Sequence, residues 1–171
     1  YGQLGQGDIT PYSSPVQVGA LTNWSKAECG GNHTLALKTD GTLWAWGYND
    51  YGQLGLGNTT PYSSPVQVGA LTNWSKVASG FYHSLALKTD GTLWAWGYNE
   101  FGQLGLGDSG TGTDRSSPVQ VGALTNWSKA EGGYNHTLAL KTDGTLWSWG
   151  DNEYGQLGQG DITPYSSPVQ V

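Results

Sequence analysis

Three histidines recur once in each repeat of the chain, at His33, His83 and His136. Imidazole can serve as a metal ligand or a general base, but a zinc site brings together several Cys and His ligands at short spacings. No repeat carries such a paired set of ligands. We therefore expect no metal site and no cofactor. We expect each histidine to hydrogen-bond a neighbouring backbone group and to hold the first turn of its repeat.

Two other patterns in the sequence resemble sites that carry chemistry. Residues 108–114 read DSGTGTD and alternate oxygen-bearing side chains as a calcium loop does, but they lack the bidentate Glu and the carboxylates of such a loop. No nucleophile, base and orienting group recur together, and no glycine-rich phosphate loop joins a strand to a helix. The sequence therefore predicts a protein that is not an enzyme.

Composition excludes several classes of partner. The 171 residues include 13 acids and 7 bases, which gives a formal net charge of −6. Nucleic-acid binding requires clustered Lys and Arg, so we expect no nucleic acid as partner. No apolar run approaches the roughly 20 residues that cross a bilayer, so we expect no membrane span. The single Cys29 cannot form an internal disulfide and leaves the compartment unknown, although our interpretation leans towards an extracellular or surface-associated protein.

The chain is built of repeats. A GQLG segment recurs at spacings of 50, 50 and 53 residues, each time after an aromatic residue: Tyr1, Tyr51, Phe101 and Tyr154. Residues 154–171 also match residues 1–18 at all eighteen positions. Fixed periods of 20 to 50 residues mark units that bury their apolar faces on one another. We expect this chain to be part of a longer array or of a periodic assembly.

Each repeat reads as four short strands, in the first repeat residues 24–30, 33–38, 42–46 and 63–68. The AspGly pair at 40–41 signals a tight turn between the second and third strands. Trp44 and Trp46 alternate with Leu43 and Ala45, so the third strand is apolar on both faces and must be covered on both. The pattern predicts an all-β fold of β-propeller blades, each of four antiparallel strands.

A longer signature recurs in all three repeats. In the second repeat it comprises Gly80, His83, Ala86, Leu87, Asp90, Gly91, Trp96, Gly97, Asn99, Gly102, Gln103, Leu104, Gly105 and Gly107. These residues resemble the blade signature of the regulator-of-chromosome-condensation repeat, and the resemblance covers essentially the whole chain. It implies a closed ring of seven blades.

We divide the chain into three blades, residues 19–68, 69–121 and 122–171, preceded by one extra outer strand at 1–18 from a preceding blade. Three blades do not close a ring, because propellers have 4 to 8 blades. The end faces therefore need cover from other copies of this chain or from further repeats of the same chain, as part of a larger ring or array. Structural roles in each blade are assigned to the histidines, to turn residues Asp40, Asp90 and Asp143, and to core residues Trp46, Trp96 and Trp149.

Variation in the turns and links between strands is confined to one end of the blades. In a four-stranded meander the first and third turns share one end, and these are the segments that differ between the three blades. The same end holds eight of the thirteen acids and the only arginine. Aromatic residues anchor interfaces, and a field of one sign attracts partners of the other. This predicts a surface for a basic protein partner, with candidates Asn32, Tyr48, Phe81, Tyr82, Tyr98, Glu100, Asp108, Asp114, Tyr134, Asn135 and Asp151.

The leading hypothesis is a non-enzymatic protein-binding or scaffold module that recognises its partner through this variable acidic and aromatic face. Near-identity of the repeats also fits a structural protein that forms a fibre or surface assembly. The family resemblance implies two further alternatives: nucleotide exchange on a small GTPase, the activity of the family's namesake, and enzyme inhibition. The namesake adds a wedge-like insertion and a basic tail, whereas the longest insertion here is the three-residue extension near Asp108.

Overall fold

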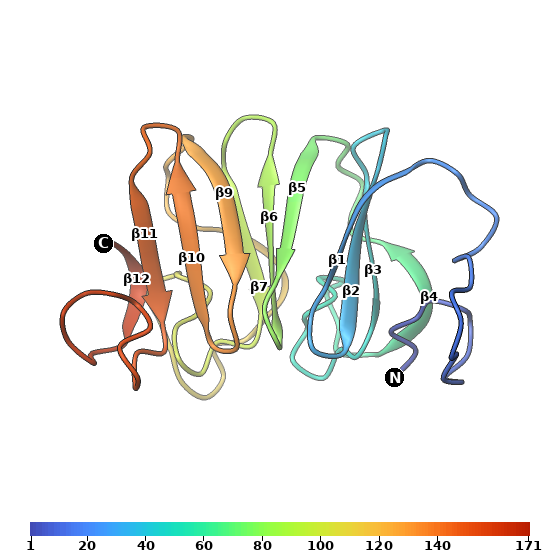
Figure 1. Cartoon of the computed structure of the whole chain (residues 1–171), viewed down its shortest axis with the longest axis horizontal. Helices are drawn as coiled ribbons and strands as arrows, with labels where there is room; N and C mark the ends of the chain where they lie inside the picture. Colours follow the sequence, from blue (N-terminus) through green and yellow to red (C-terminus); the bar gives the residue numbers. More distant parts are fainter.

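The computed structural model describes residues 1–171 as twelve strands without a helix, arranged as three separate four-stranded antiparallel sheets. The sheets stand side by side (Figure 1), which confirms the predicted all-β fold of three blades. Blade 1 contains β1 (Trp24–Cys29), β2 (His33–Lys38), β3 (Leu43–Gly47) and β4 (Tyr62–Gln67). Blade 2 contains β5 (Trp74–Ser79), β6 (His83–Lys88), β7 (Leu93–Gly97) and β8 (Arg115–Gln120). Blade 3 contains β9 (Trp127–Gly132), β10 (His136–Lys141), β11 (Leu146–Gly150) and β12 (Tyr165–Gln170).

The strands of each blade pair in sequence order, so that the first and fourth strands form the edges of the sheet. The fourth strands each contain a proline, at Pro65, Pro118 and Pro168, and an edge is where a missing N–H is tolerated. The first strands β1, β5 and β9 lie next to one another along the inner side of the row. No helix in the chain is long and apolar enough to cross a membrane.

The turn between the second and third strands is closed in the same way in each blade. In blade 1, Asp40 Oδ1 accepts hydrogen bonds from the Thr42 N–H at 3.0 Å and the Thr42 hydroxyl at 2.7 Å. Gly41 has a φ of 78°, a left-handed conformation that favours glycine. An added Cβ there would lie 2.1 Å from the Thr72 carbonyl oxygen of the link to blade 2. Only glycine therefore fits this turn.

Each blade has two different apolar faces. One face presents leucines, such as Leu35, Leu37 and Leu43 in blade 1, and the other presents tryptophan and alanine. The leucine face of blade 1 packs against Trp74, Val77, Ala86 and Trp96 of blade 2. The leucine face of blade 2 packs in the same way against Trp127, Ala130, Ala139 and Trp149 of blade 3. The core thus consists of two copies of one interface between blades.

The loop after each third strand reaches across to the following blade. The Gln53 carbonyl of blade 1 accepts hydrogen bonds from Ser84 Oγ at 2.8 Å and from Trp96 Nε1 at 2.9 Å, both in blade 2. The Gln103 carbonyl accepts the same pair of bonds from Thr137 and Trp149 of blade 3, at 2.8 and 2.9 Å. The recurrent GQLG segment therefore joins neighbouring blades.

Residues 1–18 differ from the prediction, because they form no strand. A fourth strand pairs with the third strand of its own blade, and the third strand that would precede residues 1–18 is not in this sequence. Residues 1–7 instead contact blade 1 in the way that the GQLG loop of each blade contacts the following blade. The Gln3 carbonyl accepts hydrogen bonds from Thr34 Oγ1 and Trp46 Nε1, both at 2.9 Å.

Two glycines of the third loop of blade 2 provide a matched pair of variants that tests the contact between this loop and blade 3. Gly105 has a φ of 71°, and an added Cβ would lie 2.7 Å from Trp149 Nε1, whereas Gly112 has a φ of 84° with no atom within 4 Å of such a Cβ. Gly112→Ala should lower the free energy of unfolding by about 1 to 2 kcal/mol, the cost of the left-handed backbone. Gly105→Ala should cost about 1 to 3 kcal/mol more, because the loop must also move away from blade 3.

Urea unfolding of both variants and the parent chain, followed by tryptophan fluorescence, measures this difference. Equal destabilisation by the two substitutions would contradict the close contact between the GQLG loop and the next blade.

Candidate functional site

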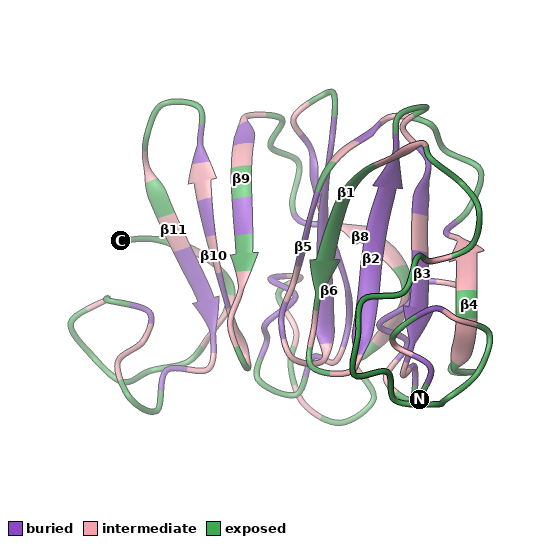
Figure 2. Cartoon of the chain, turned by 45° about the vertical axis from the view of Figure 1, so that its right-hand side comes forward, coloured by how far each residue is buried: buried purple, intermediate pink, exposed green.

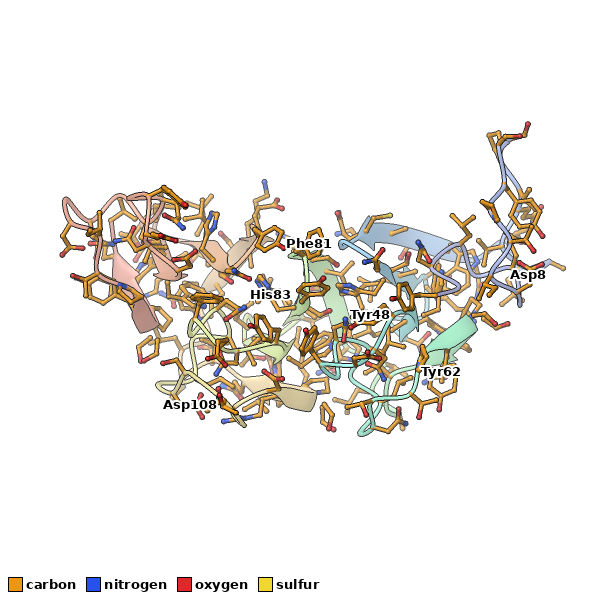
Figure 3. All side chains as sticks on the ribbon, turned by 90° about the horizontal axis from the view of Figure 1, so that it is seen from below. Asp8, Tyr48, Tyr62, Phe81, His83 and Asp108 are labelled. Carbon is orange, nitrogen blue, oxygen red and sulfur yellow. The ribbon has the colours of Figure 1, made fainter.

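The variable turns gather at one end of the blades. The first and third turns of all three blades lie at the lower end in Figure 1, and the identical second turns and links lie at the upper end. Seen from that lower end (Figure 3), Phe81, His83 and Tyr48 lie near the middle of the molecule, whereas Asp8 and Asp108 lie at its periphery. The candidate residues therefore share one end but not one cluster.

Aromatic rings form a continuous row across this end, which we call the aromatic belt: Tyr1, Tyr48, Tyr51, Phe81, Tyr82, Tyr98, Phe101 and Tyr134. Its centre is Tyr82, whose ring centroid lies 5.1 Å from that of Tyr51 and 4.5 Å from that of Phe81. Phe81 in turn stacks on Tyr134 at 4.4 Å. The belt thus connects all three blades through ring contacts.

Three belt members are not among the residues that the sequence predicts. Tyr1, Tyr51 and Phe101 each precede a GQLG segment, where the sequence pattern indicates only the period of the repeat. Because the following loop crosses to the next blade, Tyr51 of blade 1 reaches Tyr98 of blade 2, with centroids 4.7 Å apart. The aromatic residue that recurs before each GQLG segment was a signal present in the sequence. The direction in which its ring points depends on the path of the loop that follows it.

The predicted acids serve different roles. Asp108 forms an ion pair with Arg115 and accepts a hydrogen bond from Asn99 Nδ2, and Asp114 Oδ1 accepts one from the Asn99 N–H at 2.8 Å. Both carboxylates therefore shape the extended third loop of blade 2. Asp151 Oδ1 accepts a hydrogen bond from the N–H of Glu153 at 3.0 Å. Glu100 is exposed beside the belt, as is Asp50, which was not among the candidates.

Asn32 and Asn135 take part in the structure of this end of the molecule through their backbone carbonyl groups. The Asn32 carbonyl accepts a hydrogen bond from the Tyr48 N–H, and the Asn135 carbonyl accepts one from the Asp151 N–H, both at 2.9 Å. The Tyr82 carbonyl does the same for Tyr98 at 3.1 Å. The first turn therefore holds the start of the third loop in every blade, while its side chains are free to differ.

His33 and His83 join blades instead of holding their own turns. His33 Nε2 lies 2.9 Å from Ser84 Oγ of blade 2, and His83 Nε2 lies 3.0 Å from Thr137 Oγ1 of blade 3. The predicted backbone bond is wrong because the ring lies on the leucine face, which packs against the next blade. His33 and Ser84 are both buried, and the Ser84 hydroxyl donates to the Gln53 carbonyl. No three His, Cys, Asp or Glu side chains gather closely enough to hold a metal ion.

Comparison with known proteins identifies the family. The model of the RCC1-like domain matches residues 1–171, the whole chain. The chain belongs to the RCC1-like domain family. This confirms the resemblance to the regulator-of-chromosome-condensation repeat that the blade signature carries.

Relatives of the RCC1-like chain are longer than the chain itself. It is 38% identical over 174 residues to the ultraviolet-B receptor UVR8 of Arabidopsis thaliana, covering 99% of this chain and 39% of UVR8. It is 33% identical over 180 residues to the human E3 ubiquitin-protein ligase HERC2, covering 99% of this chain and 3% of HERC2. The chain therefore spans well under half of the length of either relative.

Solved structures show the same fold. Prp20p of Saccharomyces cerevisiae, described with its binding properties to Gsp1p and histones, superposes with a TM-score of 0.86 at 23% identity over 99% of this chain and 44% of Prp20p. Human WBSCR16 superposes with a TM-score of 0.81 at 26% identity over 100% of this chain and 45% of WBSCR16.

Burial keeps the histidines of the RCC1-like blades neutral. It lowers the pKa of His33 to about 4 and that of His83 to about 3, because no water solvates the imidazolium between blades. Burial also lowers the pKa of the half-buried His136 at the end of blade 3. These residues couple the contact between blades to pH.

Stability should therefore fall on mild acidification. The unfolded chain binds protons at these histidines below their ordinary pKa of 6.5, and the folded chain does not, so the free energy of unfolding decreases between about pH 6.5 and 4.5. Each of His33 and His83 contributes about 1.4 kcal/mol per pH unit at the lower end of this window. Urea unfolding at a series of pH values gives the slope of the free energy of unfolding against pH.

The variant His83→Gln should lose about half of that slope, whatever its stability at pH 7. The control His136→Gln, at a half-buried position, should change the slope less. An unchanged slope in His83→Gln would contradict a neutral histidine between blades 2 and 3.

Proposed function

We propose that this RCC1-like chain is a non-enzymatic protein-interaction module that binds a basic segment of its partner on the aromatic belt. The single observation that supports the proposal is the continuous row of tyrosine and phenylalanine rings across three blades, with exposed carboxylates beside it. Tyrosine offers a large contact area together with a polar tip, and aromatic residues anchor protein interfaces.

The electrostatics of the belt favour a cationic ligand. Burial, and then the neighbouring Asp50 carboxylate, raises the pKa of the Tyr48 phenol above its usual range. Burial and then Glu100 act in the same direction on the pKa of Tyr98. The phenols therefore stay neutral, so their ring faces can hold Arg or Lys side chains by cation–π contact while the carboxylates pair with the charge.

The Ser and His side chains support a role without catalysis. The one serine hydroxyl that hydrogen-bonds a histidine is that of Ser84, whose partner His33 lies across the contact between blades 1 and 2. Both side chains are buried, and the hydroxyl already donates to the Gln53 carbonyl, so a substrate has no access to it. The pair serves the contact between blades.

The test uses nona-arginine as the probe and fluorescence anisotropy as the measurement. The double variant Tyr82→Ala/Glu100→Lys should weaken binding at least about tenfold, because it removes the central ring of the belt and one exposed charge. Glu28→Lys is the control, since Glu28 is exposed outside the belt and the change in net charge is the same.

Equal loss in both variants would mean that the peptide senses only the net charge, and would contradict recognition by the belt. Failure of the parent chain to bind the peptide would contradict the proposal outright. Circular dichroism of each variant verifies that the blades remain folded.

A further inference from the structure

Tyr51 is the residue through which the phenol rings of blade 1 come closest to those of blade 2. Its ring centroid lies 4.7 Å from that of Tyr98 and 5.1 Å from that of Tyr82, both in blade 2. Tyr48, the other tyrosine of blade 1 in the belt, lies 5.9 Å from Tyr82. The rings of Tyr51 and Tyr98 are tilted by 50°. These two rings therefore form the closest contact between phenols of the two blades.

Hydrogen bonds hold both members of this pair in place. The Tyr51 N–H donates to Gln53 Oε1 at 3.1 Å, and the Gln53 carbonyl is itself bound to blade 2. The Tyr98 N–H donates to the Tyr82 carbonyl, also at 3.1 Å. Two reactive groups that are held in contact before a reaction avoid much of its entropic cost. The folded chain thus brings the two phenols together without any loop having to move.

The pair is also more open to oxidation than the tryptophans of the chain. Figure 2 shows that β2 and β3 are largely buried, whereas the loops at the lower end of the blades are partly exposed, as Tyr51 and Tyr98 are. A nearby positive charge disfavours removal of an electron from a ring. Each partly exposed tryptophan has a Lys ammonium 3.5 to 5.0 Å from its ring centroid: Trp24, Trp44, Trp94 and Trp147.

We propose that Tyr51 and Tyr98 form an oxidative cross-linking site that joins blades 1 and 2 covalently. The co-reactant is hydrogen peroxide, used through a haem peroxidase. Each phenol loses one hydrogen atom, and the two hydrogen atoms reduce one peroxide molecule to two molecules of water. The two radicals form a carbon–carbon bond between the ring carbons ortho to the phenol oxygens, and the hydrogens on these carbons move to the oxygens. The product is a dityrosine.

The junction between blades 2 and 3 lacks this pair. The residues equivalent to Tyr51 and Tyr98 are Phe101 and Asp151, and neither carries a phenol. The cross-link therefore forms at one of the two junctions, and the other serves as an internal control. The reaction requires only the two rings and is independent of the partner that we propose for the belt.

The test treats the folded chain with hydrogen peroxide and a haem peroxidase. Dityrosine fluorescence gives the yield, and mass spectrometry after proteolysis identifies the linked peptides, whose mass is lower by two hydrogen atoms than the sum of the two peptides. The main product should link Tyr51 to Tyr98 within one chain, with a yield per chain that does not depend on protein concentration. Linked chains should unfold at a urea concentration about 1 M higher, because the link closes a loop of the unfolded chain.

Three conservative variants separate this pair from the rest of the belt. Tyr51→Phe and Tyr98→Phe each keep a ring in the belt and remove one phenol, and each should lower the yield within the chain at least about fivefold. Tyr134→Phe is the matched control, since the ring of Tyr134 lies 6.5 Å from that of Tyr82 and does not contact the pair. It should leave the yield unchanged.

A further variant transfers the site to the second junction. In the Tyr51→Phe chain, the added substitutions Phe101→Tyr and Asp151→Tyr should produce a link between positions 101 and 151. Circular dichroism verifies that each variant remains folded.

Equal yields in the parent, Tyr51→Phe and Tyr134→Phe would overturn the proposal, as would links that form only between chains or a main product that joins other residues. Absence of any link in the parent, under conditions that couple free N-acetyltyrosine, would overturn it outright. Linked chains that unfold at a lower urea concentration than unlinked ones would show that the link forms in a distorted chain, which would contradict a pair preorganised by the fold.

Discussion

Each sheet of this protein is apolar on both faces, and residues of its own blade cover each face only in part. The leucine face of one blade requires the tryptophan face of the next, as Leu35 and Leu43 meet Trp74 and Trp96. The stability of a blade therefore depends on its position in the row. Blade 2 has a neighbour on each side, and the strand β6 is buried along its whole length, whereas buried and half-buried residues alternate in β10 of blade 3.

The loop that joins the blades also positions the aromatic belt, the surface that we propose for recognition. Gln53 fixes the loop of blade 1 on blade 2 through its carbonyl, and Tyr51, two residues earlier, is thereby set between Tyr82 and Tyr98. The belt is thus built of rings from neighbouring blades that pack against one another. A rigid aromatic surface loses little conformational entropy on binding, which favours its use in recognition. Packing between blades and the proposed recognition therefore depend on the same few residues.

Much of the fold could be predicted from short-range chemistry. The AspGly turns, the alternation of Trp44 and Trp46 with Leu43 and Ala45, and the edge position of Pro65 follow from local rules of strand and turn geometry. The direction of the GQLG loops could not be predicted from the sequence, because the same spacing of residues also fits a loop that folds back on its own blade. This is why the belt positions of Tyr51 and Phe101 were not predicted. The contact of His33 with Ser84 was not predicted because the histidine ring lies on the leucine face, which packs against the next blade. The first 18 residues lack a strand because pairing needs a partner strand.

Hydrogen exchange followed by mass spectrometry tests most directly whether neighbours, and not the hydrogen bonds within a sheet, stabilise a blade. Strands β6 and β10 have equivalent ladders to their flanking strands, and the peptides 80–87 and 133–140 that cover them differ in sequence. At a concentration where the chain is monomeric, peptide 133–140 should exchange faster than peptide 80–87. Equal exchange of the two peptides would show that a blade is as stable with a neighbour on one face as with neighbours on both, and would contradict this account.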